Sequence, residues 1–455
     1  MSSIIISFAL VLLTVYLTFQ YWYSYWKKRH IAYVKPSPVF GNLLDLLLLK
    51  VSFGELFQNL YDHPDLRNSA YGGIFLLHQP ALILRDPALI QKVLIKDFNM
   101  FLNRYEAADL KYDSMGSLCL PLAKYPIWRN CRLKLAEIFT TGRIKERMYP
   151  LMLAVVTDMD DFILNKFEND KVFIDLDVKE MFSLYTTDLT SVLHYGFKAN
   201  GLKKGHSVLR QQTKELFKTN FKKIIDFFII FFLPHFATNF RAKVFSPAYS
   251  NFMRQFCRDI LEQRKNSPLD STNKGDLLDV LEKFQKLETV MNNFTHHPDF
   301  IPSQLAIFLL AGFETSSSVM GFILYELTKY ESIQQRLRLE LKQAFQQEEF
   351  LSYEKLQELT YLHQVVCEGL RLYPAAAFVN RECTPNDKIA KGCYLKPDLF
   401  IPKGMPVYIS ILGLHRDSRV SCDEVCAYIV FLNKFKTKIK TIFFFYQTNN
   451  FSVLV

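Results

Sequence analysis

Paired cysteines are missing from this sequence of 455 residues. Its eight cysteines are scattered and show no CxxC spacing, which excludes the common zinc-finger patterns and the dense disulfide framework of small secreted domains. In a chain of this length, isolated cysteines are typical of reduced thiols in a protein that faces the cytosol. We therefore expect the cysteines to be free.

Nucleic-acid-binding motifs are missing as well. No basic cluster is interleaved with aromatic residues, so we expect no nucleic-acid partner. The formal net charge of +10 still allows an anionic partner, such as a membrane surface or an acidic protein. The hydrophobic content of 49% is enough for a large core, in one domain or two, and excludes disorder of the whole chain.

Charged residues are absent from Ile4 to Trp26, and a basic cluster at residues 27–30 follows at once. This stretch of 23 residues is long enough to span a bilayer, so we expect a transmembrane anchor at residues 4–26, with the remaining chain in the cytosol. A cleaved signal peptide is the alternative, but its basic residues would precede the apolar run. The anchor is expected to end in an interfacial aromatic belt and to lead into a basic, proline-containing connector at residues 27–42; the belt consists of Trp22, Tyr23, Tyr25 and Trp26.

The most apolar internal stretch predicts a helix from about Pro302 to Lys329. Its apolar residues point in several directions, which is typical of a helix that is buried on all sides. This apolar run is interrupted by small and polar residues, namely Gly312, Glu314 and Thr315. Such residues lower the stability of a buried helix, so we expect them to have a specific role. A structural reading is also open, in which the helix narrows so that its neighbours can cross it.

Further periodic segments predict the surrounding elements. Tyr71 to Leu77 and Ala81 to Leu84 read as a hairpin, and Asp86 with Pro87 reads as the start of a helix. The very apolar segment from Phe227 to Phe236 is too short to span a bilayer, so it is either core or a surface loop that dips into the membrane.

A second predicted helix, from Tyr353 to Tyr373, carries Glu368 and Arg371 three residues apart on one face. The segment Asn380 to Cys383 follows, and then short strands from Lys396 to Gly413. Earlier in the chain, the spacing of four residues places an aromatic and a cation on one helix face, at Trp128 and Arg132. Each of these features alone has an ordinary structural explanation.

Together and in this order, the motifs resemble those of the cytochrome P450 family, in particular the microsomal kind of insects that acts on xenobiotics and endogenous lipids. The resemblance runs from the anchor to about Asp417. It rests on AGFETSS, EGLRLYP and NREC, with support from WRNCR, YVKPSPVFGN and GLHRD. It implies a mainly α fold, in which an N-terminal transmembrane helix precedes a helical domain with a small β subdomain at residues 43–417.

The resemblance also implies roles for single residues. Thr315 would hydrogen-bond dioxygen or an ordered water and Glu314 would help to deliver protons, while Ala311 and Gly312 would keep the helix thin beside a haem. Glu368 and Arg371 would form a structural ion pair. The haem propionates would be bound by Arg104, Trp128, Arg132 and Arg381.

For the whole protein, the resemblance implies a haem-dependent monooxygenase in the endoplasmic reticulum membrane. It would insert one atom of O2 into a small apolar substrate, with electrons from an NADPH-cytochrome reductase, and would contact membrane lipid through its anchor.

The sequence departs from this pattern near its end. The family's axial cysteine lies in a loop rich in glycine and phenylalanine, and we find no such loop after Arg371, so we assign no metal ligand. Cys422 and Cys426 lack the expected neighbours. We interpret residues 418–455 as an atypical tail, of the kind that mis-splicing produces. The alternative function is therefore a catalytically inactive, truncated, membrane-anchored fragment that cannot bind haem through a cysteine thiolate.

Overall fold

The computed structural model describes residues 2–167, 175–218, 220–266, 275–287, 294–345, 350–385 and 390–420. These residues form two compact units. The first, which we call the sheet unit, combines the chain up to Tyr105 with the described residues from Ala376 onward. The second, which we call the helical unit, contains the described residues from Glu106 to Ala375.

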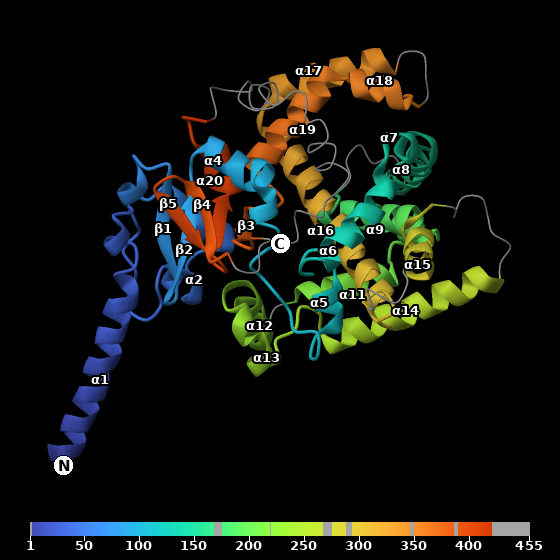
Figure 1. Cartoon of the computed structure of the whole chain (residues 1–455). Coiled ribbons are helices and arrows are strands. Elements are labelled where there is room, and N and C mark those ends of the chain that lie inside the picture. Colours follow the sequence, from blue (N-terminus) through green and yellow to red (C-terminus); the bar gives the residue numbers. More distant parts are fainter. Residues whose placement is uncertain are drawn as a thin grey trace. The chain divides into compact units, whose positions relative to one another are not determined.

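A four-stranded sheet forms the core of the sheet unit (Figure 1). Its strands lie in the order β1 (Tyr71–Leu76), β2 (Gln79–Leu84), β6 (Pro406–Ser410) and β3 (Phe378–Glu382). The β1–β2 pair is the predicted hairpin, and β2 then pairs in parallel with β6, which pairs antiparallel with β3. A separate hairpin consists of β4 (Gly392–Lys396) and β5 (Leu399–Pro402). Strands far apart in sequence are therefore joined in one sheet.

Short helices surround this sheet. One of them, α3, begins at a capping box in which Ser52 and Glu55 each bond the other's backbone N–H. Its Phe57 ring stacks on Tyr408 of β6 at a centroid distance of 4.5 Å, so α3 covers the sheet. The helices of this unit are α1 (Ser2–Tyr23), α2 (Leu44–Leu47), α3 (Phe53–Tyr61), α4 (Pro87–Gln91) and α20 (Ile411–Arg416). The predicted helix start at Asp86 is confirmed, because its side chain accepts a hydrogen bond from Leu89 N.

The N-terminal helix α1 ends at Tyr23, earlier than the expected boundary at Trp26. The expected aromatic belt is wrong for two of its members. Trp26 is 1% exposed and donates from Nε1 to Ile74 O at 3.1 Å, and Tyr23 is also buried. These two rings pack into the sheet unit because their polar tips find backbone partners there, whereas Trp22 remains partly exposed.

The helical unit is organised around one long helix, α16 (Phe300–Lys329), as predicted. It packs most extensively against α9 (Val178–Tyr195) and also contacts α5, α14, α15, α17 and α19. The other helices here are α5 (Ser114–Leu118), α6 (Ile127–Leu135), α7 (Thr141–Arg143), α8 (Tyr149–Leu164), α10 (Gly201–Lys204), α11 (Val208–Phe217), α12 (Phe221–Phe232), α13 (Ala237–Phe240), α14 (Pro247–Asn266), α15 (Leu277–Leu287), α17 (Glu331–Ala344), α18 (Tyr353–Glu358) and α19 (Thr360–Leu372).

Burial along α16 is uneven, which corrects the expectation of a helix buried on all sides. Every residue from Phe300 to Ala311 is buried. Towards the end of the helix, Phe322, Leu324 and Tyr325 are exposed. By length and composition α16 passes as a membrane span, and so does the bent pair α12–α13, but the first half of α16 is the core of its unit.

The predicted helix from Tyr353 to Tyr373 is in fact two helices, α18 and α19. Leu359 breaks the run because its ψ of 88° is not helical. The α19 part keeps the face that carries Glu368 and Arg371.

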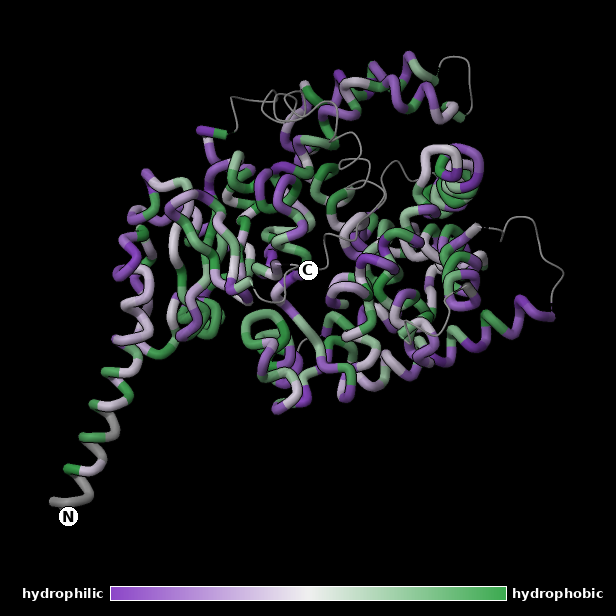
Figure 2. Tube along the Cα trace, in the orientation of Figure 1, coloured by the Kyte–Doolittle hydropathy of each residue, from purple (hydrophilic) through white to green (hydrophobic). Residues whose placement is uncertain are grey.

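The apolar segment near Phe227 is part core and part surface. Ile229, Ile230 and Phe232 of α12 are buried, while Phe221 is 79% exposed on the outer side. The chain turns by 119° between α12 and the segment Pro234–Phe240, and α12 carries both hydrophilic and hydrophobic residues (Figure 2). The core alternative is confirmed for the buried residues, while Phe227 and Phe236 are exposed and their contact with a membrane stays a prediction.

Candidate functional site

The carboxylate of Glu314 on α16 forms an ion pair with Lys179 from α9. Lys179 Nζ lies 2.6 Å from Glu314 Oε1, and it also donates to Ser317 Oγ at 3.2 Å and to Ser318 Oγ at 2.7 Å. Both side chains of the ion pair are partly exposed. No sequence pattern marks Lys179, since it lies 135 positions before Glu314 in an ordinary first helical turn.

Thr315 is buried one residue further along the same helix. Its Oγ1 donates to Ala311 O at 2.7 Å, one turn back. Because the hydroxyl proton is used in this bond, the lone pairs of Oγ1 remain able to accept a hydrogen bond. A hydroxyl bonded in this way also tends to bend a helix locally.

Gly312 lies where α16 crosses α9. A Cβ atom at this position would be 2.7 Å from Thr190 Oγ1, closer than side-chain carbon atoms normally approach. The glycine therefore lets the two helices pack tightly, which agrees with the structural reading of this residue. Its neighbour Ala311 is 2% exposed.

Glu368 and Arg371 form the expected ion pair on α19. Arg371 Nε and Nη2 donate to the two carboxylate oxygens at 2.7 and 2.6 Å, which is bidentate geometry. The hydrogen bonds to Glu368 raise the pKa of Arg371. Two residues before Arg371, Gly369 packs directly against the Ile323 side chain of α16, so the pair lies on a helix that is fixed to the central one.

The four expected propionate ligands fall into two groups, one in each unit. Trp128 and Arg132 are one turn apart on α6, with the tryptophan partly buried and the arginine exposed. In the sheet unit, Arg104 and Arg381 lie on neighbouring segments. Hydrogen bonds join these segments on both sides of the two arginines: Glu382 N donates to the backbone oxygen of Asn103 at 2.8 Å, and Tyr105 N donates to the side-chain Oδ1 of Asn380 at 3.0 Å.

These groups suit the carboxylates of a haem, because guanidinium and indole N–H groups are strong donors to carboxylate oxygens. The arginine pair in the sheet unit is the closest fit, since both of its members are only partly exposed. For the iron itself, the part of the chain that the structure describes holds six free cysteines and no cluster of three metal-ligating side chains. Cys422, Cys426 and the expected atypical tail from residue 421 lie outside the described residues.

Comparison with known proteins identifies the family. The family model for cytochrome P450 matches residues 32–420. The chain is 47% identical over 418 residues to the probable cytochrome P450 6t3 of Drosophila melanogaster, with 90% of this chain and 80% of that protein covered. It is 35% identical to the probable cytochrome P450 6g2 of the same fly, covering 88% and 78%. It is also 30% identical to cytochrome P450 6k1 of Blattella germanica, covering 90% and 78%.

Proposed function

The chain belongs to the cytochrome P450 family, and we propose that it is a membrane-anchored, haem-dependent monooxygenase that inserts one atom of O2 into a small apolar substrate. The observation that carries this proposal is the pairing of Glu314 with the buried Thr315 on α16. One is an acid that is partly exposed, and the other is a buried hydroxyl beside the small residue Ala311. This is the arrangement that proton delivery to a buried reaction centre needs.

A bound haem supplies the redox chemistry that activates dioxygen. Arg104 and Arg381 of the sheet unit would hold its propionates by charge-assisted hydrogen bonds, and Trp128 and Arg132 of the helical unit are the other proposed donors. The arginines that are partly buried contribute more to this binding than exposed ones, because water competes less for them.

The other residues handle protons and position the helix. The Thr315 hydroxyl donates a hydrogen bond to Ala311 O and accepts another from a water molecule through Oγ1. Glu314, held by Lys179, exchanges protons with solvent at its carboxylate. Gly312 keeps α16 close to α9, and the Glu368–Arg371 pair stiffens α19, which packs against α16.

The anchor is α1, a helix of 22 residues that would extend for about 33 Å. Leu10, Leu13 and Leu17 expose half or more of their surface, which suits the hydrocarbon of a bilayer. A second lipid contact is the exposed side of α12 and α13, where Phe221 and Phe240 are the most exposed aromatic residues. We assign the protein to the endoplasmic reticulum membrane, facing the cytosol, where an NADPH-cytochrome reductase donates electrons.

The test is turnover of the full chain in phospholipid vesicles with haem, NADPH and the reductase, against a panel of small apolar compounds. We expect an oxygenated product for at least one compound. Thr315→Val should reduce product roughly tenfold or more, because the oxygen that positions a proton-carrying water is then lost. The matched control is Thr328→Val, since Thr328 makes the same kind of bond, to Tyr325 O, on the exposed end of the same helix. Equal activity of both variants would count against the role of Thr315.

The inactive-fragment alternative makes the opposite prediction. A chain that cannot hold haem gives no product with any compound and no haem absorbance after reconstitution. The family match extends over most of the chain and favours the monooxygenase.

A further inference from the structure

Two cysteine thiols of the sheet unit lie next to each other. Cys383 directly follows β3 and is fully buried, whereas Cys393 lies in β4 and is partly exposed. Their sulfur atoms are 3.4 Å apart. Cys383 Sγ is also 3.3 Å from Ile401 O of β5, the residue that pairs with Cys393 across the hairpin. The two thiols are close enough to form a disulfide bond, which would bring the sulfur atoms to a separation of about 2.0 Å.

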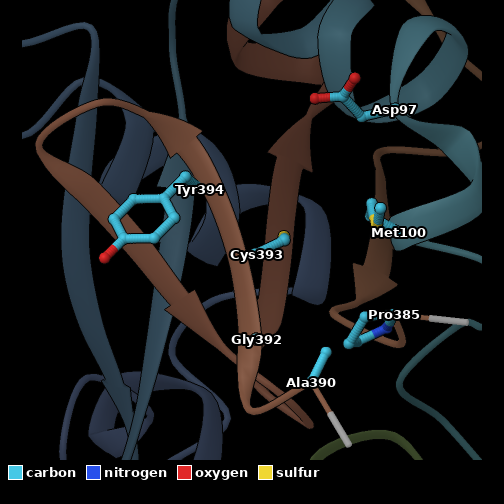
Figure 3. Close-up of a pocket in the computed structure, with 7 residues that line it drawn as sticks. All are labelled: Asp97, Met100, Pro385, Ala390, Gly392, Cys393 and Tyr394. Atoms are coloured by element: carbon cyan, nitrogen blue, oxygen red, sulfur yellow. The ribbon is translucent and has the colours of Figure 1, made fainter. Parts of the chain in front are cut away.

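Cys393 lines a cavity of about 580 Å³, together with Asp97, Met100, Pro385, Ala390, Gly392 and Tyr394. Figure 3 shows the Cys393 sulfur on the side of β4 that faces Met100, while the Tyr394 ring lies on the other side of the strand. A small molecule can therefore reach Cys393 from the cavity. Cys383 lies behind it, without exposure of its own.

The contact with Cys383 favours a reactive thiol at Cys393. The hydrogen bond with Cys383 lowers the pKa of Cys393 and outweighs burial and the negative charge of Asp97, which raise it, while the positive charge of Lys92 makes the smallest contribution and lowers it. Lys92 is fixed beside the strand, since its Nζ donates to Leu395 O at 2.7 Å. Because the thiolate is the reactive form, Cys393 is the attacking group of the pair.

We propose that Cys393 and Cys383 form a hydroperoxide-sensitive dithiol that closes to a disulfide. The Cys393 sulfur attacks one oxygen of a hydroperoxide, the O–O bond breaks, and a sulfenic acid forms while water or an alcohol leaves. The Cys383 sulfur then attacks the Cys393 sulfur, the S–O bond breaks, and the hydroxyl leaves as water with the Cys383 proton. Two electrons pass from the thiols to the peroxide, and a small thiol such as glutathione returns them.

The disulfide would tie the β4–β5 hairpin to the end of β3. The attachment point is two residues from Arg381, so oxidation would stiffen the strand on which this arginine is placed. Burial raises the pKa of both Cys257 and Cys367 to about 12, which keeps them as unreactive thiols.

The experiment treats the purified full chain with hydrogen peroxide, blocks remaining thiols with iodoacetamide and identifies the peptides by mass spectrometry. We expect a cross-linked pair of peptides that contain Cys383 and Cys393, lighter by two hydrogen atoms and restored by glutathione. The free thiol of Cys393 should be oxidised by hydrogen peroxide roughly tenfold faster than that of Cys257. The proposal is wrong if Cys393 reacts no faster than Cys257, or if both sulfurs remain open to alkylation.

Two isosteric variants separate the steps. Cys383→Ser should stop the reaction at a Cys393 sulfenic acid, which dimedone traps. Cys393→Ser should leave Cys383 unreacted, and Cys257→Ser should behave as the parent chain. Circular dichroism checks that each variant keeps its helix content, so that loss of the cross-link is not confused with unfolding. Cross-linking that persists in Cys393→Ser would also overturn the proposal.

Discussion

The carboxylate of Glu314 on α16 is bound by Lys179 from α9, with Nζ and Oε1 2.6 Å apart. The same ammonium group reaches Ser317 and Ser318, so it bonds three side chains of one helix. The polar middle of a largely apolar helix is therefore held by a single cation from its neighbour.

Replacing Glu314 with Gln should reduce turnover strongly while it lowers the stability of the fold only slightly. Because the pair is partly exposed, its loss should cost less than about 1 kcal/mol of unfolding free energy. Loss of the acid should reduce turnover by roughly tenfold to a hundredfold, as is typical for general acid–base groups. The control is Glu326→Gln on the same helix, whose carboxylate bonds Lys329 at 2.9 Å. Product formation and urea unfolding of both variants test this, and an unchanged turnover in Glu314→Gln would refute it.

The crossing of α16 and α9 predicts a steric effect at Gly312. A methyl group there would meet Thr190 Oγ1, so Gly312→Ala should destabilise the fold by about 1–3 kcal/mol, the usual cost of overpacking. The double variant with Thr190→Ala should recover most of this loss.

Gly321 provides the control for this pair. It lies on the same helix with nothing within 4 Å of a Cβ, so Gly321→Ala should stabilise the chain by about 0.5–1 kcal/mol. Equal effects of the two alanine substitutions in thermal unfolding would contradict a tight crossing at Gly312.

The ion pair on α19 should be sensitive to geometry as well as to charge. Arg371→Lys keeps the charge but loses the bidentate contact with Glu368, and we expect a loss of about 1 kcal/mol. Arg371→Ala should cost about 2 kcal/mol because Glu368 is then left without its partner. Urea unfolding of both variants measures the difference. If lysine and alanine have the same effect, the bidentate geometry contributes nothing.

Local signals in the sequence predicted the elements that carry the site. The apolar run of α16, the Asp86 cap and the β1–β2 hairpin were all readable, because each depends on residues close together in the chain. The family motifs then placed Glu314, Thr315, Glu368 and Arg371 on their helices.

What the sequence could not provide were contacts between distant segments. Lys179 with Glu314, Thr190 with Gly312 and Cys383 with Cys393 depend on how strands and helices pack, and no local pattern marks them. The burial of Trp26 was missed for a similar reason. The aromatic residues around Trp26 are typical of a membrane interface, but its indole N–H donates to Ile74 O and its ring packs directly against Gly73, where a side chain would clash with it.

His194 of α9 predicts a pH dependence of stability. Its ring packs against those of Phe139 and Phe308, at centroid distances of 6.0 and 5.1 Å. Burial, with a smaller contribution from Arg147, lowers the pKa of His194 from 6.5 to about 3. At pH values between about 3 and 6.5, the His194 side chain binds a proton in the unfolded chain but not in the folded chain. Stability is therefore complete above pH 6.5 and falls as the pH decreases, by about 1.4 kcal/mol per unit.

The measurement for His194 is the urea midpoint at pH 7 and pH 5 for the parent chain and for His194→Phe. The variant should lose part of the pH dependence, whereas His206→Phe, at an exposed position, should retain it. A pH dependence that is the same in His194→Phe and the parent would contradict the assignment.

Haem uptake tests the central claim most directly. The full chain, purified in detergent and titrated with haem, should develop a Soret band that saturates at one haem per chain. Arg381→Ala should weaken this binding roughly tenfold or more, because a charge-assisted hydrogen bond to a propionate is lost, while the exposed Arg416→Ala should not change it. A titration in which the spectrum remains that of free haem, for a chain whose circular dichroism shows it to be folded, would contradict the account.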